Sequence, residues 1–138
     1  MRVLGIDVGR KRIGLAISDP SGTLARPLQT LTVDAGAGVA AVVRELQRLA
    51  NDEEGLSAVV VGLPVSLDGS ANDQTKFVQS FIDRLRAETS LPIHSADERL
   101  TSHEAESRLA LNERSWRRRK ERLDAAAAAI ILQDYLDR

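Results

Sequence analysis

The first eighteen residues, MRVLGIDVGRKRIGLAIS, constrain the fold of this chain more than any other stretch. Residues 3–8 and 13–18 are mostly aliphatic and β-branched, which is typical of strands. Gly9, Arg10, Lys11 and Arg12 stand between the two segments and suit a turn. We therefore expect an antiparallel hairpin at the start of the chain.

An acidic residue, Asp7, lies within this hairpin. Side chains alternate along a strand, so its face of the hairpin carries mainly small residues. These are Gly5, Gly14, Ala16 and Ser18. An ionised carboxylate taken out of water is costly without a partner, so Asp7 needs a cation or a hydrogen-bond donor. The alternative is a structural Asp at a hairpin end, bonded to the turn. Hairpins of the pattern G-x-D-x-G-x-x-x-x-G occur in nucleases and in ATP-binding proteins alike.

The rest of the chain alternates between strand and helix patterns. Further strands are predicted at 24–32, 58–62 and 91–96, and Pro27 breaks the first of these early. Helices are predicted at 39–49, around 77–85, at 101–111 and at 123–136. Thr101 and Glu104 fit a capping box at the start of the third helix. The apolar run 58–62 is typical of a parallel strand covered on both faces. The order predicts one domain over residues 1–138, an α/β fold of the ribonuclease H-like kind: a mixed sheet of about five strands with helices on both faces.

Composition excludes several kinds of chemistry. The chain has no cysteine and two histidines, so disulfides, thiol catalysis and a His-rich zinc site are not expected. No apolar run approaches the length needed to span a bilayer, and we expect a cytoplasmic protein without membrane association. The net charge is -1, so any contact with nucleic acid must come from local clusters among the 19 Lys and Arg residues.

Such a sheet is expected to bring three acids together at one end. They are Asp7 near the end of the first strand, Glu98 after the fifth strand, and Asp124 in the first turns of the last helix. Clustered carboxylates repel one another unless a cation lies between them. We therefore predict that the three acids are ligands of Mg²⁺ or Mn²⁺, as a pair of ions, and that the site hydrolyses a phosphodiester. Individually, Asp124 could complement the helix dipole and Glu98 could be a solvated charge. His103 is more simply an exposed residue at a helix start.

The dense positive cluster of the chain lies just before Asp124. It comprises Arg114, Arg117, Arg118, Arg119 and Lys120, with the only tryptophan, Trp116, among them. Together with Arg10, Lys11 and Arg12 of the hairpin turn, these side chains are candidates for phosphate contacts, and Trp116 for stacking on a base. The alternatives are a solvated basic loop and a Trp that anchors it to the core.

Four blocks together resemble the RuvX family, also called YqgF. They are G-I-D-V-G-x-x-x-x-G, V-V-G-L-P with D-G shortly after, D-E-R-L-T-S, and D-A-A-A-A-A-I-I-L-Q, in this order between residues 5 and 133. The resemblance implies a ribonuclease H-like fold related to the resolvase RuvC and a nuclease that depends on a divalent metal. It places the family's acids on Asp7, Glu98 and Asp124. The arginine-rich loop 111–120 departs from the family by lacking glycines.

The resemblance implies two substrates, branched DNA cut as a four-way junction and precursor 16S rRNA trimmed at its 5′ end. A junction resolvase needs a symmetric dimer for paired cuts, so a homodimer is possible. Two other classes remain open. A small ATP-binding protein is disfavoured because actin-like and sugar-kinase folds clamp nucleotide between two such domains. A catalytically silent RNA-binding factor for ribosome assembly is disfavoured by the intact acids.

Overall fold

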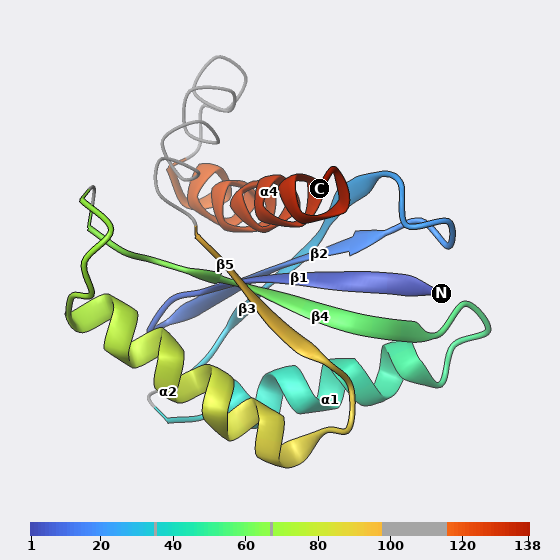
Figure 1. The fold of residues 1–138 in the computed structure, drawn as a ribbon, viewed down its shortest axis with the longest axis horizontal. Helices are drawn as coiled ribbons and strands as arrows, with labels where there is room; N and C mark the ends of the chain where they lie inside the picture. Colours follow the sequence, from blue (N-terminus) through green and yellow to red (C-terminus); the bar gives the residue numbers. More distant parts are fainter. Residues whose placement is uncertain (35, 67, 98–115) are drawn as a thin grey trace.

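The computed structural model describes residues 1–34, 36–66, 68–97 and 116–138, with only the backbone at 116–123. Five strands form one mixed sheet in the order β3-β2-β1-β4-β5. They are β1 (Arg2–Val8), β2 (Arg12–Ser18), β3 (Ala25–Thr32), β4 (Leu56–Leu63) and β5 (Ile93–Asp97). Strands β1, β4 and β5 run parallel, and β2 and β3 are antiparallel to their neighbours. Helices α1 (Gly38–Ala50) and α2 (Asp73–Glu88) cover one face, and α4 (Trp116–Leu136) covers the other (Figure 1). The predicted mixed sheet with helices on both faces is confirmed.

The face toward α1 and α2 is packed with large aliphatic side chains. Strands β1 and β2 alternate as their sequences predict, and Leu4, Ile6, Leu15 and Ile17 on this face have no exposed surface. They meet the apolar stripes of the two helices, including Val42 of α1 and Ile82, Leu85 and Phe81 of α2. Helix α2 begins with a capping box between Asn72 and Thr75. This face supplies most of the hydrophobic core.

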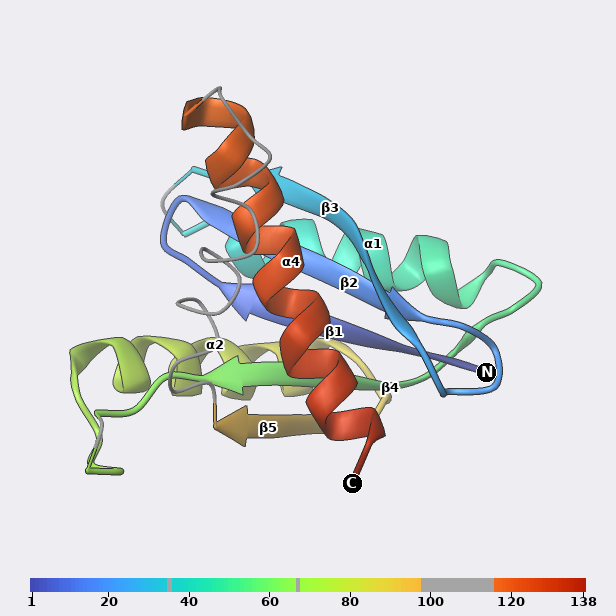
Figure 2. The ribbon, with the colours of Figure 1, turned by 90° about the horizontal axis from the view of Figure 1, so that it is seen from above.

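The face toward α4 is built from small residues. Helix α4 crosses β1, β2 and β3 (Figure 2), and its Ala128 and Leu132 pack on Val3 and Ala16. A side chain at Gly5 would place its Cβ 2.7 Å from Leu132 Cβ, so the strand and helix backbones lie unusually close. Gln133 fixes the helix on the sheet edge, because its side chain accepts the Ala25 N–H at 2.9 Å and donates to the Thr23 carbonyl at 3.0 Å.

Two element predictions need correction. Pro27 does not break β3, which runs from Ala25 to Thr32 with an irregular register where Ala16 pairs with Pro27. An edge strand tolerates a missing N–H on its open side. Helix α4 begins at Trp116 and not at Leu123, so residues 117–122 are helical and not a loop. Arg, Lys and Glu are good helix formers, so a lack of apolar residues does not end a helix. The predicted capping box at Thr101 and the helix to Leu111 lie outside the described residues.

Within the described ranges, no helix combines the length and the apolar character needed to cross a membrane.

Candidate active site at the carboxyl end of strand β1

Asp7 faces α4 at the carboxyl end of β1. It is paired across the hairpin with Gly14, and directly paired residues of antiparallel strands point to the same side of the sheet. A Cβ at Gly14 would lie 2.0 Å from the backbone oxygen of Asp124, so that side is the one covered by α4. Asp7 is half-buried. The fold therefore brings two of the three predicted acids, Asp7 and Asp124, to one place.

Asp124 is held by a basic residue of the hairpin. The Nε atom of Arg12 lies 3.1 Å from Asp124 Oδ2, with the two side chains 33% and 24% exposed. Arg12 is two residues before Gly14 and so points to the same face of β2. Because the pair is only partly exposed, solvent screens it less than a surface ion pair. Arg12 thus fixes the Asp124 carboxylate next to the strand that carries Asp7.

The position of Asp124 differs from the predicted one. It lies eight residues after the first residue of α4, well inside the helix and not in its first turns. The dipole of a helix acts on charges within its first and last turns. Stabilisation of a helix start therefore does not explain this acid, and its contact with the hairpin does.

The remaining predicted residues are only partly covered by the structure. Glu98, His103 and Arg114 lie outside the described residues. Glu98 directly follows Asp97, the last residue of β5, and β5 runs parallel to β1 and β4. Trp116 and the basic residues Arg117, Arg118, Arg119 and Lys120 belong to the first turns of α4. Among described residues, no group of three His, Asp or Glu side chains that could hold a metal is found.

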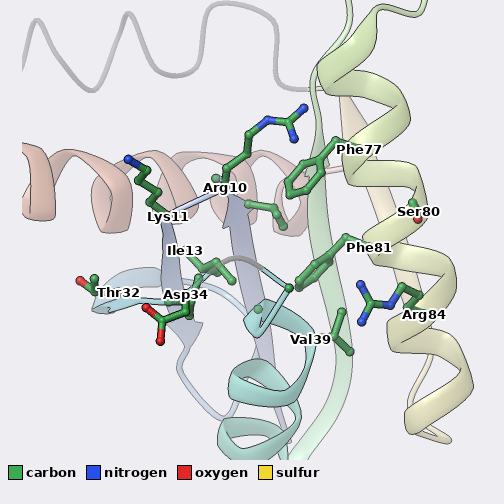
Figure 3. A pocket seen from close by; sticks show the side chains of 15 residues that line it. Arg10, Lys11, Ile13, Thr32, Asp34, Val39, Phe77, Ser80, Phe81 and Arg84 are labelled. Atoms are coloured by element: carbon green, nitrogen blue, oxygen red, sulfur yellow. The ribbon is translucent and has the colours of Figure 1, made fainter.

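The hairpin turn divides its basic residues between the two faces of the sheet. Arg12 points to α4, whereas Arg10 and Lys11 line a cavity of about 760 Å³ on the face of α1 and α2 (Figure 3). From the sequence, Arg10, Lys11 and Arg12 are predicted to act together at the hairpin turn beside Asp7. The alternation from Gly14 predicts the orientation of Arg12. No sequence signal indicates the cavity, because it is lined by three segments that are far apart in the sequence, within residues 8–13, 32–39 and 77–84.

Comparison with known proteins places this chain in a family. The model of the RuvX family, described as Holliday junction resolvase, matches residues 1–138. The chain belongs to the RuvX family. A relative from Moorella thermoacetica is 44% identical over 138 residues, which is 100% of this chain and 96% of the relative. A relative from Anaeromyxobacter dehalogenans is 42% identical, with 100% and 98% covered. Both carry the name "Putative pre-16S rRNA nuclease".

Solved structures with this fold include a viral resolvase and a bacterial RuvC. The Fowlpox virus resolvase in complex with Holliday junction DNA matches with a TM-score of 0.58 and 12% identity, covering 99% of this chain and 97% of the resolvase. RuvC of Thermus thermophilus matches with a TM-score of 0.52 and 17% identity, covering 99% and 94%. At these identities the likeness shows a shared fold, and it confirms the predicted ribonuclease H-like architecture. The prediction of a nuclease is confirmed by the family and by the names of these relatives.

Proposed function

We propose that this chain is a divalent-metal-dependent nuclease that trims the 5′ end of precursor 16S rRNA, with Asp7, Glu98 and Asp124 as its metal ligands. The observation that carries the proposal is the meeting of Asp7 with Asp124 across Gly14, where a side chain has no room. The choice of substrate follows the names of the relatives that are 44% and 42% identical.

The donor set fits a hard cation. Asp7 and Asp124 offer only carboxylate oxygens, the ligands that Mg²⁺ and Mn²⁺ prefer. Both are partly open to solvent, so an ion and a phosphate can reach them. Glu98, which directly follows the last residue of β5 in the sequence, is the third proposed ligand. A bound pair of ions supplies charge stabilisation on the attacking and leaving oxygens of a phosphodiester.

The residues of the chain prepare this site. Gly5 and Gly14 let α4 approach closely enough for Asp124 to reach the face of Asp7. Arg12 orients Asp124 through the 3.1 Å contact and offsets the repulsion between the two carboxylates. Both effects set the distance between the acids before substrate binds, which is the kind of preorganisation that catalysis requires.

Basic residues at the same end of the fold are proposed to hold the substrate backbone. Arg10 and Lys11 are exposed on the turn that follows Asp7. The helical segment 116–120 leads directly to Asp124, and we assign Trp116, Arg117, Arg118, Arg119 and Lys120, with Arg114, to contacts with nucleic acid. Contacts of this type give affinity that depends on salt and hardly on sequence.

The first test is cleavage of an end-labelled RNA that mimics the extended 5′ end of 16S rRNA, with Mg²⁺ and with Mn²⁺. Asp7→Asn and Asp124→Asn should each lower the rate about a thousandfold, since they remove several kcal/mol of charge stabilisation. Asp134→Asn is the matched control, because Asp134 is an exposed acid of the same helix that pairs with Arg138. Full metal-dependent cleavage by Asp7→Asn would refute the assignment of the acids.

A four-way DNA junction run in parallel tests the substrate. Paired symmetric cuts in the junction, with the RNA intact, would replace the rRNA assignment by that of a dimeric resolvase. Tight RNA binding without cleavage, unchanged by loss of either acid, would instead make the chain a binding factor. Cleavage of the RNA alone supports the proposal.

A further inference from the structure

The cavity of about 760 Å³ lies on the opposite face of the sheet from Asp124, yet it begins at the residue next to Asp7. Val8 lines the cavity and Asp7 faces α4, because successive side chains of a strand point to opposite faces. We call this cavity the α1–α2 pocket. It is enclosed by the hairpin turn, the chain around Asp34, the start of α1 and the middle of α2 (Figure 3).

The floor of the α1–α2 pocket is apolar and includes an aromatic face. Ile13, Val39 and Phe81 form part of the floor and are 1%, 6% and 6% exposed, so they belong to the core. Phe77 is only partly buried and lies at the pocket side of α2. Arg10 lies over its ring, with Cζ 4.3 Å from the ring centroid. The ring of Phe77 thus already contacts a planar group, which is the shape that a base also presents.

The rim of the pocket is positively charged. Arg10, Lys11 and Arg84 are exposed there, and none of them forms an ion pair with another residue in the described ranges. Asp34 is the only acid among the described residues that line it. Helix α1 also begins beside the pocket without a side-chain cap and without an acid in its first turn. The rim therefore favours an anionic group.

We propose that the α1–α2 pocket holds one unpaired nucleotide of the nucleic-acid substrate. An apolar, aromatic floor with a cationic rim matches the two halves of a nucleotide, its base and its phosphate. The volume is in the range of about 300–1,000 Å³ that holds ligands of this size. This inference rests on the proposed function and refines it: the substrate is cut next to a single-stranded segment.

The position of the pocket supports a bound strand over a free nucleotide. Asp7 and Val8 are consecutive, so the proposed cleavage site and the pocket are separated by little more than the sheet itself. The exposed turn of Arg10 and Lys11 joins the two faces. A strand that leaves the acids can pass over this turn, with its phosphates on the two cations and the next unpaired base in the pocket.

The test measures binding without cleavage, in EDTA, by fluorescence anisotropy. An RNA duplex with a short single-stranded extension is compared with the same duplex made blunt. The wild-type protein should bind the extended RNA about tenfold more tightly, as expected for one stacked base. Phe77→Leu, which keeps the apolar bulk, and Arg84→Glu should remove this preference and leave the affinity for blunt RNA within about twofold.

Two variants serve as matched controls. Phe77→Trp retains an aromatic face and should keep the preference. Its fluorescence is compared with that of the wild type, whose only tryptophan is Trp116, and the quenching beyond the wild-type level should appear with the extended RNA but not with the blunt one. Arg44→Glu makes the same charge change on an exposed residue of α1 outside the pocket and should also keep it. Circular dichroism and the melting temperature check that all variants are folded.

Several outcomes would overturn the inference. Equal binding of the two RNAs by the wild type, or a preference that survives Phe77→Leu, means that no unpaired base enters the pocket. Quenching of the Phe77→Trp variant by adenosine monophosphate but not by the extended RNA makes it a site for a free nucleotide. Failure of the proposed function is distinct: it shows as absent cleavage with Mg²⁺ while the binding preference in EDTA persists.

Discussion

The two faces of the sheet are covered by helices in different ways. Toward α1 and α2, strands β1 and β2 present Leu4, Ile6, Ile13, Leu15 and Ile17, each at most 1% exposed. Toward α4 the same strands present glycine and alanine, and the helix lies so close that a Cβ at Gly5 or Gly14 would collide with it. The polar residues of the site, Asp7 and Arg12, lie only on the second face.

The first face mainly stabilises the fold, whereas the second face mainly positions the residues of the site. Each large side chain on the first face contributes about 1.5–3 kcal/mol by leaving water, and its exact shape can vary if volume is conserved. On the second face the small residues bury little area but set the distance between the backbones of β2 and α4. That distance decides whether Asp124 meets Asp7. Enlarging a residue should therefore be harmful on the α4 face, whereas shrinking one is harmful on the other face.

The strongest test of this contrast is Gly14→Ala. The new Cβ would lie 2.0 Å from the Asp124 backbone oxygen and 2.9 Å from the Ala125 nitrogen, both backbone atoms, so α4 must move. We expect the free energy of unfolding to fall by about 3 kcal/mol, which is at the upper end of the range for substitutions that overpack a core. Cleavage by the folded protein should fall as well, because Asp124 moves away from Asp7. Urea denaturation and the cleavage assay measure the two effects.

Gly22→Ala is the control for this change. Gly22 has a φ of +71° but no atom within 4 Å of a built Cβ, so the substitution should cost about 1 kcal/mol from backbone strain alone. Its cleavage rate should be unchanged. If Gly14→Ala were as mild as Gly22→Ala, the close approach of α4 would not be what positions the acids.

The second test is Arg12→Met, which removes the partner of Asp124 on the α4 face. Without metal, we expect a loss of about 1–2 kcal/mol, between the values for surface and buried ion pairs, since the pair is 33% and 24% exposed. With Mg²⁺, the rise in melting temperature should be larger than in the wild type, because the ion no longer competes with Arg12 for the carboxylate. Thermal unfolding with and without Mg²⁺ measures this.

Arg26→Met, on an exposed residue of β3, controls for the loss of one positive charge. Adding Asp7→Asn to Arg12→Met should abolish the response to Mg²⁺. An equal response in the wild type and in Arg12→Met would show that the ion does not bind at Asp124.

The sequence was sufficient for most of the described elements and for the faces of β1 and β2. Periodicity alone predicts that Leu15 and Asp7 point to opposite sides, because burial on each face selects one register. The prediction was wrong at the start of α4. Residues Arg117 to Lys120 are charged but favour helix, so hydrophobic periodicity does not detect this part of the helix. The prediction was also wrong at Pro27, since an edge strand absorbs a proline by an irregular register that depends on its neighbour.

At the site, the types of residue and their alternation along each strand were more informative than the spacing of the acids in the sequence. Asp7 among glycines indicates a buried carboxylate, and its nearness to Asp124 follows once α4 is known to cover Gly14. The Arg12 contact needs the same knowledge, because alternation gives its face but not its partner. The α1–α2 pocket could not be predicted, since Arg84 and Lys11 come together only through the packing of α2 against the hairpin turn.

On the face of α1 and α2, Ile17→Val provides the opposite test. Removing one methylene from a side chain with no exposed surface should cost about 1 kcal/mol. The cleavage rate of the folded protein should not change, because nothing on this side fixes the acids. A fall in cleavage at equal folded fraction would show that the two faces are coupled. Urea denaturation and the cleavage assay with Mg²⁺ distinguish the two results.

The smallest effect is expected at the far end of the hairpin, where Asp19 shows what a purely structural acid looks like. It accepts hydrogen bonds from the Thr23 and Leu24 N–H groups and the Ser21 hydroxyl, and these, led by Ser21, lower its pKa from 3.8 to about 2. Because this pKa is lower in the folded state than in the unfolded state, the ionised Asp19 stabilises the fold above the unfolded pKa. This stabilisation is lost as the pH falls through about 2.

Asp19→Asn keeps an acceptor oxygen but does not titrate, so the advantage of the wild type in melting temperature should shrink between pH 4 and pH 2. Asp83→Asn, on an exposed acid of α2 that lies 3.9 Å from Arg86, controls for the loss of one surface carboxylate. If Asp19→Asn left cleavage intact while Asp7→Asn abolished it, the same hairpin would carry one acid for folding and one for chemistry.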